Sequence, residues 1–401
     1  MAKIPSVTIN KKAAHALARG GCWVYAGDVL RADDTYENGG IVAVLDEKGR
    51  FLGQGFINDR SKIRIRLLTR RESSVIDGAF FAEAARRCVA YRKAAANLAA
   101  CRLVFGEADF LPGLTVDLYR DILVVQSLAL GIDRFKMTII AALKAALRDE
   151  GVMIRGVYER SDGPSRAQEG LAPVKGFIGE PFDLSDVTII ENGLSLRVDV
   201  ADGQKTGYFL DQWENRLFLR RFAKDAEALD CFCNAGGFAL NLCAGGAKSV
   251  LAVDVSEDAL SLARQNAVSN GYEDKISFLK ADAFDLLREM AEEKRKFDVV
   301  VLDPPAFTKA RSTVDGAIRG YKEINLRGMK LVRDGGYLAT CSCSRFLGEE
   351  LFRSLLTEAA TDGNFFLRQA ARLYQAADHP VVLGAEESDY LKCMVFQVFR
   401  R

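Results

Sequence analysis

The sequence predicts an α/β fold in which a Rossmann-like domain with a doubly wound parallel sheet follows a small β-barrel and a central α+β domain. From about residue 204 onward, apolar strands alternate with helices, which is the pattern of a parallel sheet covered on both faces. Short strands punctuated by glycine fill the first seventy residues, as in a small barrel. A chain of 401 residues with 49% hydrophobic content is long enough for two or three domains. We therefore expect domains at 1–73, 74–183 and 184–401.

The composition disfavours a membrane protein, a metalloprotein and a disulfide-stabilised protein. The apolar runs at 122–130 and 297–302 fall well short of the ~20 residues that a membrane span needs. No apolar leader follows the first residues, so we expect a cytoplasmic location. The nine cysteines have neither disulfide nor zinc spacing. With His15 and His379 as the only histidines, Ser/His/Asp hydrolysis is also disfavoured.

The predicted barrel carries the densest positive charge of the chain. Residues 1–75 hold thirteen Lys/Arg and eight Asp/Glu, a surplus of five positive charges. We expect strands at 41–45, 51–56 and 63–68, and the period of two places Lys62, Arg64 and Arg66 on one strand face. These cations form either a solvated face over the barrel core or, together with Arg70, a track for RNA phosphates.

The elements of the other two domains follow from apolar spacing and turn residues. In the central domain we expect helices at 76–98 and 135–147 and strands at 114–119, 122–128 and 154–159. A hairpin with strands at 187–190 and 194–200 opens the third domain. Parallel strands follow at 228–232, 249–253, 276–279, 297–302 and 336–340, with helices at 259–270 and 283–290, and a strand at 391–399 closes the sheet.

A glycine turn and acids at successive strand ends indicate a nucleoside cofactor. Asn234-Ala235-Gly236-Gly237 follows the first parallel strand, and Asp254 ends the second, where a carboxylate can accept hydrogen bonds from ribose hydroxyls. NAD enzymes use G-x-G-x-x-G to hold a pyrophosphate, and this turn lacks that spacing. S-adenosylmethionine has no phosphate, so we favour it over NAD. Asp282 and the backbone of Ala283 are placed to read the adenine amine, and Asp282 also fits a helix N-cap.

An acid and a thiol should meet at the same edge of the sheet. Asp303 ends the fourth strand before two prolines, which make a rigid open turn; it can bind a base edge while Phe307 stacks on an extruded base. Cys341 and Cys343 follow the fifth strand and should point to one face. They are either core-filling residues or a nucleophile for carbon 6 of a pyrimidine, which activates carbon 5 for methylation.

With these motifs assembled, the whole chain resembles the PUA-containing 23S rRNA cytosine-5 methyltransferases of the RlmI type. In the barrel and the central domain the resemblance rests on 23–27, 53–70, 106–107 and 111–117. In the third domain it rests on 206–212, 303–307, 319–325 and 376–380. It implies a PUA-like barrel that binds RNA, a central α+β domain and an S-adenosylmethionine-dependent methyltransferase domain.

The resemblance also implies roles for single residues. It makes Cys343 the nucleophile, with Cys341 at a position that is usually not cysteine, and makes Asp303 the residue that holds the base. The residues expected to hold or cover S-adenosylmethionine are Phe209, Asp211, Gln212, Asn234, Gly236, Gly237, Asp254, Asp282, Ala283 and Asp303. The expected RNA contacts are Lys62, Arg64, Arg66, Arg70 and Phe307. The implied partner is 23S rRNA or an early large-subunit particle, and a homodimer is plausible.

The chain departs from related patterns at a few positions. Pro305 stands where many other RNA cytosine-5 methyltransferases have a second cysteine, so no second-cysteine release step is expected. Trp213 replaces a common arginine, and Asn234-Ala235 replaces bulkier, hydroxyl-bearing residues. Two other functions stay open: methylation of a base nitrogen, because Asp-Pro-Pro-x-Phe resembles the motif of amino methyltransferases, and RNA binding or ribosome assembly without turnover.

Overall fold

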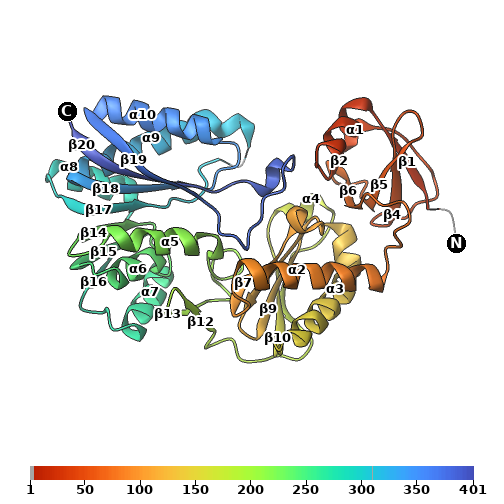
Figure 1. The fold of residues 1–401 in the computed structure, drawn as a ribbon, viewed down its shortest axis with the longest axis horizontal. Coiled ribbons are helices and arrows are strands. Elements are labelled where there is room, and N and C mark those ends of the chain that lie inside the picture. Colours follow the sequence, from red (N-terminus) through yellow and green to blue (C-terminus); the bar gives the residue numbers. More distant parts are fainter. Residues whose placement is uncertain (1–3, 309) are drawn as a thin grey trace. The chain divides into compact units, whose positions relative to one another are not determined.

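The computed structural model describes residues 4–308 and 310–401, which form two compact units (Figure 1). The first unit comprises Met1–Val187, Asp199–Leu210 and Ala377–Asp389. The second comprises Thr188–Val198, Asp211–Ala376 and Tyr390–Arg401. The first unit therefore includes both the predicted barrel and the predicted central domain, and the three-domain division stays a prediction. No helix in the described ranges is long and apolar enough to cross a membrane.

A six-stranded sheet forms the N-terminal part of the first unit. Its strand order is β2-β6-β5-β4-β1-β3, and β1 runs parallel to β4. The elements are β1 (Ser6–Ile9), α1 (Lys11–Ala18), β2 (Trp23–Tyr25), η1 (Ala26–Asp28), β3 (Val29–Ala32), β4 (Ile41–Leu45), β5 (Phe51–Ile57) and β6 (Ile63–Thr69). Ile65 and Leu67 of β6 are buried in the core of this sheet, as the period-two pattern predicts.

A five-stranded sheet covered by two long helices completes the first unit. The strand order is β11-β10-β9-β8-β7, and α2 and α3 pack against each other and against the sheet. The elements are α2 (Gly78–Ala95), β7 (Ala100–Phe105), η2 (Gly106–Asp109), β8 (Leu114–Tyr119), β9 (Ile122–Ser127), α3 (Leu130–Asp149), β10 (Gly156–Ser161), α4 (Ser165–Gln168) and β11 (Val174–Ile178). The Asp77 carboxylate caps α2 by accepting the N–H of Phe80 at 3.0 Å.

The second unit contains a hairpin and a seven-stranded sheet of order β16-β15-β14-β17-β18-β20-β19. Figure 1 shows α5, α6 and α7 on one face of that sheet and α8, α9 and α10 on the other. The elements up to the middle of the sheet are β12 (Thr188–Glu191), β13 (Leu194–Arg197), η3 (Leu210–Gln212), α5 (Trp213–Leu219), η4 (Arg220–Phe222), β14 (Glu227–Cys231), α6 (Gly237–Ala244), β15 (Ser249–Asp254), α7 (Glu257–Ser269) and β16 (Ile276–Lys280). The remaining elements are α8 (Ala283–Glu292), β17 (Phe297–Leu302), η5 (Arg311–Thr313), α9 (Val314–Leu331), β18 (Val332–Ser342), α10 (Glu349–Gly363), β19 (Phe365–Tyr374), η6 (Glu386–Ser388) and β20 (Lys392–Arg400).

Two expectations for this sheet are wrong. The C-terminal strand does not close it, because β20 lies between β18 and β19 and pairs antiparallel with both. The fifth parallel strand does not end before the first cysteine, because β18 extends to Ser342 and includes Cys341. The antiparallel pairing of β18 with β20 therefore includes Cys341 and ends before Cys343.

Candidate active site

The expected site residues of the second unit gather where neighbouring parallel strands end. Cys231 of β14 pairs with Val253 of β15 and with Leu302 of β17, and Leu302 pairs with Thr340 of β18. The carboxyl ends of these four strands therefore lie at one edge of the sheet. In doubly wound sheets this edge, at the point where the strand order reverses, is where ligands bind.

The glycine turn after β14 has an unusual backbone. Phe232, Asn234 and Gly236 all have positive φ, at 64°, 48° and 82°. Glycine suits the third of these positions because it adopts positive φ without strain, and because a Cβ there would lie 3.2 Å from the Cβ of Ala263 in α7. Gly237 then begins α6 as a buried residue. The turn is thus shaped by its backbone and leaves little side-chain bulk at the strand ends.

Asp254 ends β15, and Asp282 follows β16 as the N-cap of α8. The half-buried Asp254 accepts the N–H of Asn234 at 2.9 Å and the N–H of Ser256 at 3.0 Å, which fixes its carboxylate beside the glycine turn. Asp282 is exposed and caps α8 by accepting the N–H of Phe284 at 2.8 Å. Ala283 is the buried first residue of that helix. The N-cap interpretation of Asp282 is confirmed, and a contact of Asp282 with adenine stays a prediction.

Asp303 lies in a chain of polar side chains that links the sheet to α5. Gln212 donates from Nε2 to Asp303 Oδ2 at 3.0 Å, and Asn215 donates to Gln212 Oε1 at 2.6 Å. Asp211, on the other side of Gln212, accepts a hydrogen bond from the Tyr390 hydroxyl. Gln212 therefore orients the Asp303 carboxylate directly, and Asp211 holds the segment that carries Gln212. Sequence reasoning missed Asn215, for which the chain offers no signal.

Cys341 and Cys343 differ in accessibility. Cys341 is fully buried and pairs across the strands with Cys393 of β20. A hydrogen bond with Cys393 and burial hold the pKa of the Cys341 thiol well above its usual range. Cys343 follows the last residue of β18 and is half-buried, whereas the other eight cysteines, all in the described ranges, are buried. Of the two cysteines expected on one face, Cys343 is the more accessible, and its role as nucleophile stays a prediction.

The surroundings of Cys343 are polar and partly aromatic. The next residue, Ser344, is buried, and its hydroxyl lies 3.1 Å from that of Tyr321. Burial raises the pKa of Tyr321 to about 12, so its hydroxyl keeps its proton at neutral pH. The buried Lys392 donates from Nζ to the Ser344 carbonyl at 2.8 Å. Phe307 is half-buried, with its ring centroid 4.5 Å from that of Tyr321. Lys392 begins the apolar strand β20, and the sequence pattern there does not indicate a functional residue.

Asp230 is a buried acid that sequence reasoning also missed. It lies in β14 with no exposed surface and accepts the N–H of Ala239 at 2.9 Å. Burial, reinforced by the charges of Asp303 and Asp254, raises its pKa to about 8. An ionisable residue between the apolar Leu229 and Cys231 was the available signal.

The expected RNA-contacting residues of the barrel belong to the first unit. Lys62 is exposed just before β6, and Arg64 pairs with Asp59. Arg66 is held by Glu169 at 2.8 Å and Glu107 at 3.6 Å, with 12% of its side chain exposed. A half-buried guanidinium that is already paired with two carboxylates is less available to phosphate.

Two further residues of the expected site also belong to the first unit. The Arg70 guanidinium donates to the Gly21 carbonyl at 2.7 Å. Phe209 is half-buried, with the ammonium of Lys205 4.4 Å from its ring centroid. The assignments of Arg70 to RNA and of Phe209 to the cofactor stay predictions.

The acceptor groups at the strand ends fit S-adenosylmethionine. Its ribose hydroxyls, adenine amine and ammonium group are all hydrogen-bond donors, and Asp254, Asp282 and Asp303 offer carboxylate acceptors. No group of metal-ligating side chains occurs among the described residues. Bound there, the cofactor supplies an electrophilic methyl group.

Comparison with known proteins agrees with this arrangement. Residues 7–70 match the family of PUA-like domains, and residues 161–397 match the S-adenosylmethionine-dependent methyltransferases. Ribosomal RNA large subunit methyltransferase I of Alteromonas mediterranea is 39% identical over 388 residues, which cover 96% of each chain. The protein of that name from Klebsiella pneumoniae is 36% identical over 392 residues, with 97% of each chain covered.

Solved structures share the fold at lower identity. A protein described as a SAM-dependent methyltransferase from Streptococcus mutans superposes with a TM-score of 0.82 at 20% identity, covering 98% of this chain and all of that one. SMU.776, a methyltransferase solved in complex with SAH, gives a TM-score of 0.83 at 20% identity and the same coverage. The expected fold and cofactor are thereby confirmed. The chain belongs to the ribosomal RNA large subunit methyltransferase I family of S-adenosylmethionine-dependent methyltransferases.

Proposed function

We propose that this protein methylates carbon 5 of a cytosine in 23S rRNA and that Cys343 is the nucleophile. The observation that carries the proposal is the position of Cys343: it is the half-buried cysteine of the described chain and follows a strand that ends beside Asp303. The curated relatives are named large-subunit rRNA methyltransferases, which supports rRNA as the substrate. We place the reaction in the cytoplasm, on rRNA or an early particle, and a homodimer stays a prediction.

Carbon 5 of cytosine is a poor nucleophile, and addition of a thiol to carbon 6 activates it. The Cys343 thiolate forms a bond from Sγ to carbon 6, which makes the ring an enamine whose carbon 5 can attack the methyl group. Carbon 5 takes the methyl group, the bond between that group and the sulfonium sulfur breaks, and the proton on carbon 5 leaves to a base. The bond from Sγ to carbon 6 then breaks and releases 5-methylcytosine with the thiolate.

Asp303 is suited to hold the base during this sequence. Its carboxylate is oriented by Gln212 and can accept a hydrogen bond from the exocyclic amine of cytosine. The two prolines after it keep the turn open, since proline fixes φ and lacks an N–H. Cys341 is unsuited to the nucleophilic role, because it is fully buried and its raised pKa disfavours the thiolate.

The experiment supplies methyl-labelled S-adenosylmethionine and rRNA that lacks its own modifications, followed by digestion and identification of the labelled nucleoside by mass spectrometry. Labelled 5-methylcytidine is expected from the wild type and from Cys341→Ala, and none from Cys343→Ala. An RNA carrying 5-fluorocytidine at the target should form a stable adduct with the wild type and not with Cys343→Ala. Formation of 5-methylcytidine by Cys343→Ala at the normal rate would refute the nucleophile assignment.

One alternative is favoured by a specific observation. The segment from Asp303 to Phe307 resembles the motif of amino methyltransferases, which act on a base nitrogen. In that case label would appear on adenine or guanine, and no adduct with 5-fluorocytidine RNA would form. RNA binding without any transfer of label would instead indicate a binding or assembly factor.

A further inference from the structure

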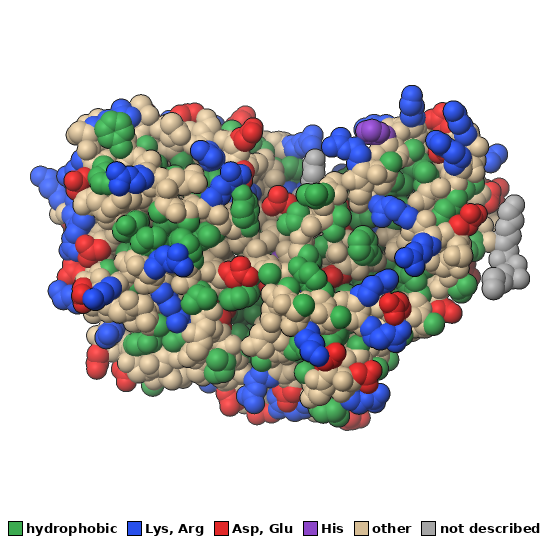
Figure 2. All heavy atoms as spheres, viewed as in Figure 1, with side chains coloured by type: hydrophobic (Ala, Val, Ile, Leu, Met, Phe, Trp, Pro, Cys, Tyr) green, Lys and Arg blue, Asp and Glu red, His purple; other side chains and the backbone are tan. Residues whose placement is uncertain are grey.

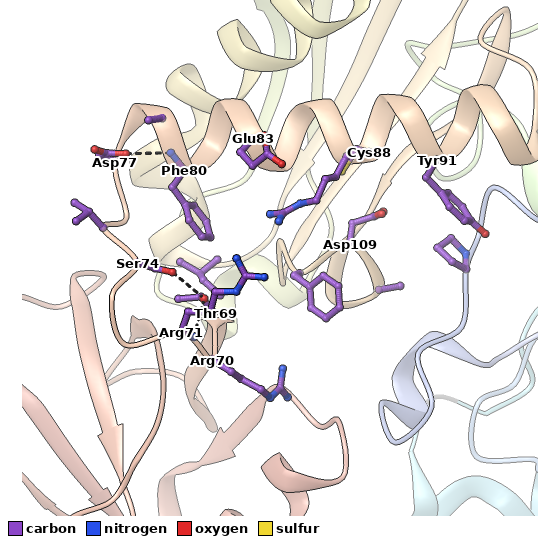
Figure 3. A pocket seen from close by; sticks show the side chains of 17 residues that line it. Thr69, Arg70, Arg71, Ser74, Asp77, Phe80, Glu83, Cys88, Tyr91 and Asp109 are labelled. Carbon is purple, nitrogen blue, oxygen red and sulfur yellow. Dashed lines mark hydrogen bonds between the residues drawn. The ribbon is translucent and has the colours of Figure 1, made fainter.

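A cavity in the first unit is lined by none of the residues expected at the methyl-transfer site. It has a volume of about 770 Å³, within the usual range of ~300–1,000 Å³ for ligand pockets. Its walls come from α2, from the 68–77 segment that includes the end of β6, from the 108–110 segment and from Pro380 (Figure 3). Every one of these segments belongs to the first unit.

One face of α2 supplies the long wall of the cavity. Phe80, Glu83, Arg87 and Tyr91 line it, at spacings of three, four and four residues. These spacings place side chains on the same side of a helix. Figure 3 shows Phe80, Glu83 and Tyr91 projecting from the helix on the side of the cavity. The wall therefore places two charged groups between two aromatic rings along about three helical turns.

Two aromatic rings of the cavity are unusually exposed. Phe110 is 46% exposed and Tyr91 is 41% exposed. Phe110 has a φ of 58°, in the left-handed region that bulky residues rarely adopt. The turn holds it there, because the N–H of Phe110 donates to Glu107 O and that of Leu111 donates to Gly106 O. Backbone strain that is retained at an exposed ring suggests that the ring binds a ligand.

The charges around the cavity leave a positive surplus. Its three acids are engaged: Asp109 pairs with Arg92 at 2.5 Å, Glu83 pairs with Arg86 at 2.9 Å, and Asp77 caps α2. Within the described ranges, the guanidinium groups of Arg71 and Arg87 make no hydrogen bond or ion pair, and both residues are exposed. The arginines can therefore neutralise an incoming anion without first breaking a protein contact.

Charges of both signs are mixed on the visible face of the molecule (Figure 2). Figure 2 shows acidic and basic side chains interspersed over the visible face, as a formal net charge of +1 suggests. The positive surplus at the cavity is therefore not a consequence of the overall charge.

We propose that this cavity binds one nucleotide of a single-stranded stretch of the RNA substrate, with the base against Phe110 and Tyr91 and the phosphate at Arg71 and Arg87. The proposal rests on the proposed function, because it requires that the substrate be RNA. Single-stranded RNA exposes both a flat base and a phosphate, and aromatic rings with nearby arginines are the groups that bind them. An acyl chain would leave the arginines unused, and an acidic peptide would leave the rings unused.

Photo-crosslinking tests the location of the contact. The full-length protein is mixed with 23S rRNA transcribed with 4-thiouridine, irradiated, digested with trypsin and analysed by mass spectrometry. We expect crosslinks on the tryptic peptides 88–92, which contains Tyr91, and 103–120, which contains Phe110. Crosslinks confined to other peptides would overturn the proposal.

Titration of a fluorescein-labelled, unstructured RNA hexanucleotide by anisotropy tests the contribution of each group. Phe110→Ala should raise Kd about 5- to 100-fold, as expected for loss of one base stack, and Phe110→Tyr should restore binding. Arg87→Ala should lower the salt dependence of log Kd by about one unit. Lys93→Ala is the matched control, because this exposed cation of α2 pairs with Glu150, and neither residue lines the cavity; the change should leave Kd unchanged.

The outcomes separate this proposal from the proposed function. If the wild type transfers no methyl group to rRNA, the proposed function fails. If it does transfer methyl groups but Phe110→Ala and Arg87→Ala keep the wild-type KM for rRNA and Kd for the hexanucleotide, the cavity proposal alone fails. Tighter binding of an oligoglutamate peptide than of the hexanucleotide, lost in Arg87→Ala, would also overturn it in favour of a peptide partner.

Discussion

Replacing the buried Asp230 by Asn should stabilise the second unit, and the gain should grow as pH rises through neutrality. Asp230 has no exposed surface, and one carboxylate oxygen accepts the N–H of Ala239. Burial, with the nearby charges of Asp303 and Asp254, raises its pKa from 3.8 to about 8. Asn keeps an acceptor for Ala239 and carries no charge, so it imitates the protonated acid.

The sign and size of the effect follow from proton linkage. Because the pKa is raised in the folded state, the stabilising contribution of protonated Asp230 is complete below about pH 3.8 and is lost as pH rises through about 8. About four pKa units at 1.36 kcal/mol per unit give an upper bound of about 6 kcal/mol over the whole window. Between pH 6 and 8 the wild type should lose roughly 2 kcal/mol through this group, and Asp230→Asn should lose none of it.

Urea unfolding followed by tryptophan fluorescence measures this difference. The chain has two tryptophans, and in a Trp23→Phe background the signal comes from Trp213 of the second unit. Free energies of unfolding are compared at pH 6, 7 and 8 for Asp230→Asn and for Asp274→Asn, whose side chain is exposed. Parallel pH dependences for wild type and Asp230→Asn would show that Asp230 is not the titrating group and would refute the reasoning.

Two further substitutions in the second unit have defined outcomes. Arg216→Met should lower the free energy of unfolding in urea by about 3–5 kcal/mol, because Glu191 stays buried without the two 2.7 Å hydrogen bonds of this ion pair. The double variant Arg216→Met, Glu191→Leu should recover most of this loss, and no recovery would contradict the account. Lys392→Met removes two 2.8 Å hydrogen bonds, one to the Ser344 carbonyl beside Cys343, and should lower kcat in the methyl-transfer assay more than it raises KM for S-adenosylmethionine. The exposed Lys248→Met serves as control, and equal effects of the two changes would count against the role of Lys392.

Several strongly patterned strands were predicted with the right bounds, whereas the mostly buried β7 and the mostly exposed β19 were not predicted. β4, β8 and β17 begin and end where the apolar pattern predicts, because their alternating or continuous burial leaves a clear signal. β19 was missed, since most of its residues are exposed or half-buried and its pattern resembles a polar segment. That omission also produced the wrong edge for the sheet, because β20 needed a partner on its outer side.

The positions of the acids could be predicted, but their partners could not. A carboxylate at the carboxyl end of a parallel strand lies at the ligand-binding edge of the sheet. The strand pattern was therefore enough to predict the positions of Asp254 and Asp303. Gln212 meets Asp303 across 91 residues of sequence, and Arg66 meets Glu169 across 103. Contacts between residues this far apart in the sequence depend on the tertiary fold, and they cannot be predicted from a local period.

The choice between the two cysteines turns on where cross-strand pairing stops. A period of two places Cys341 and Cys343 on the same side, so the pattern alone cannot separate them. In the structure β20 continues to pair with β18 through Ser342, which lies opposite Lys392, and the last pair but one sets Cys341 against Cys393. Cys341 is therefore covered by a partner strand, whereas Cys343 is the first residue beyond the ladder. We therefore expect Cys343, beyond the end of β18, to be the thiol that a base can reach.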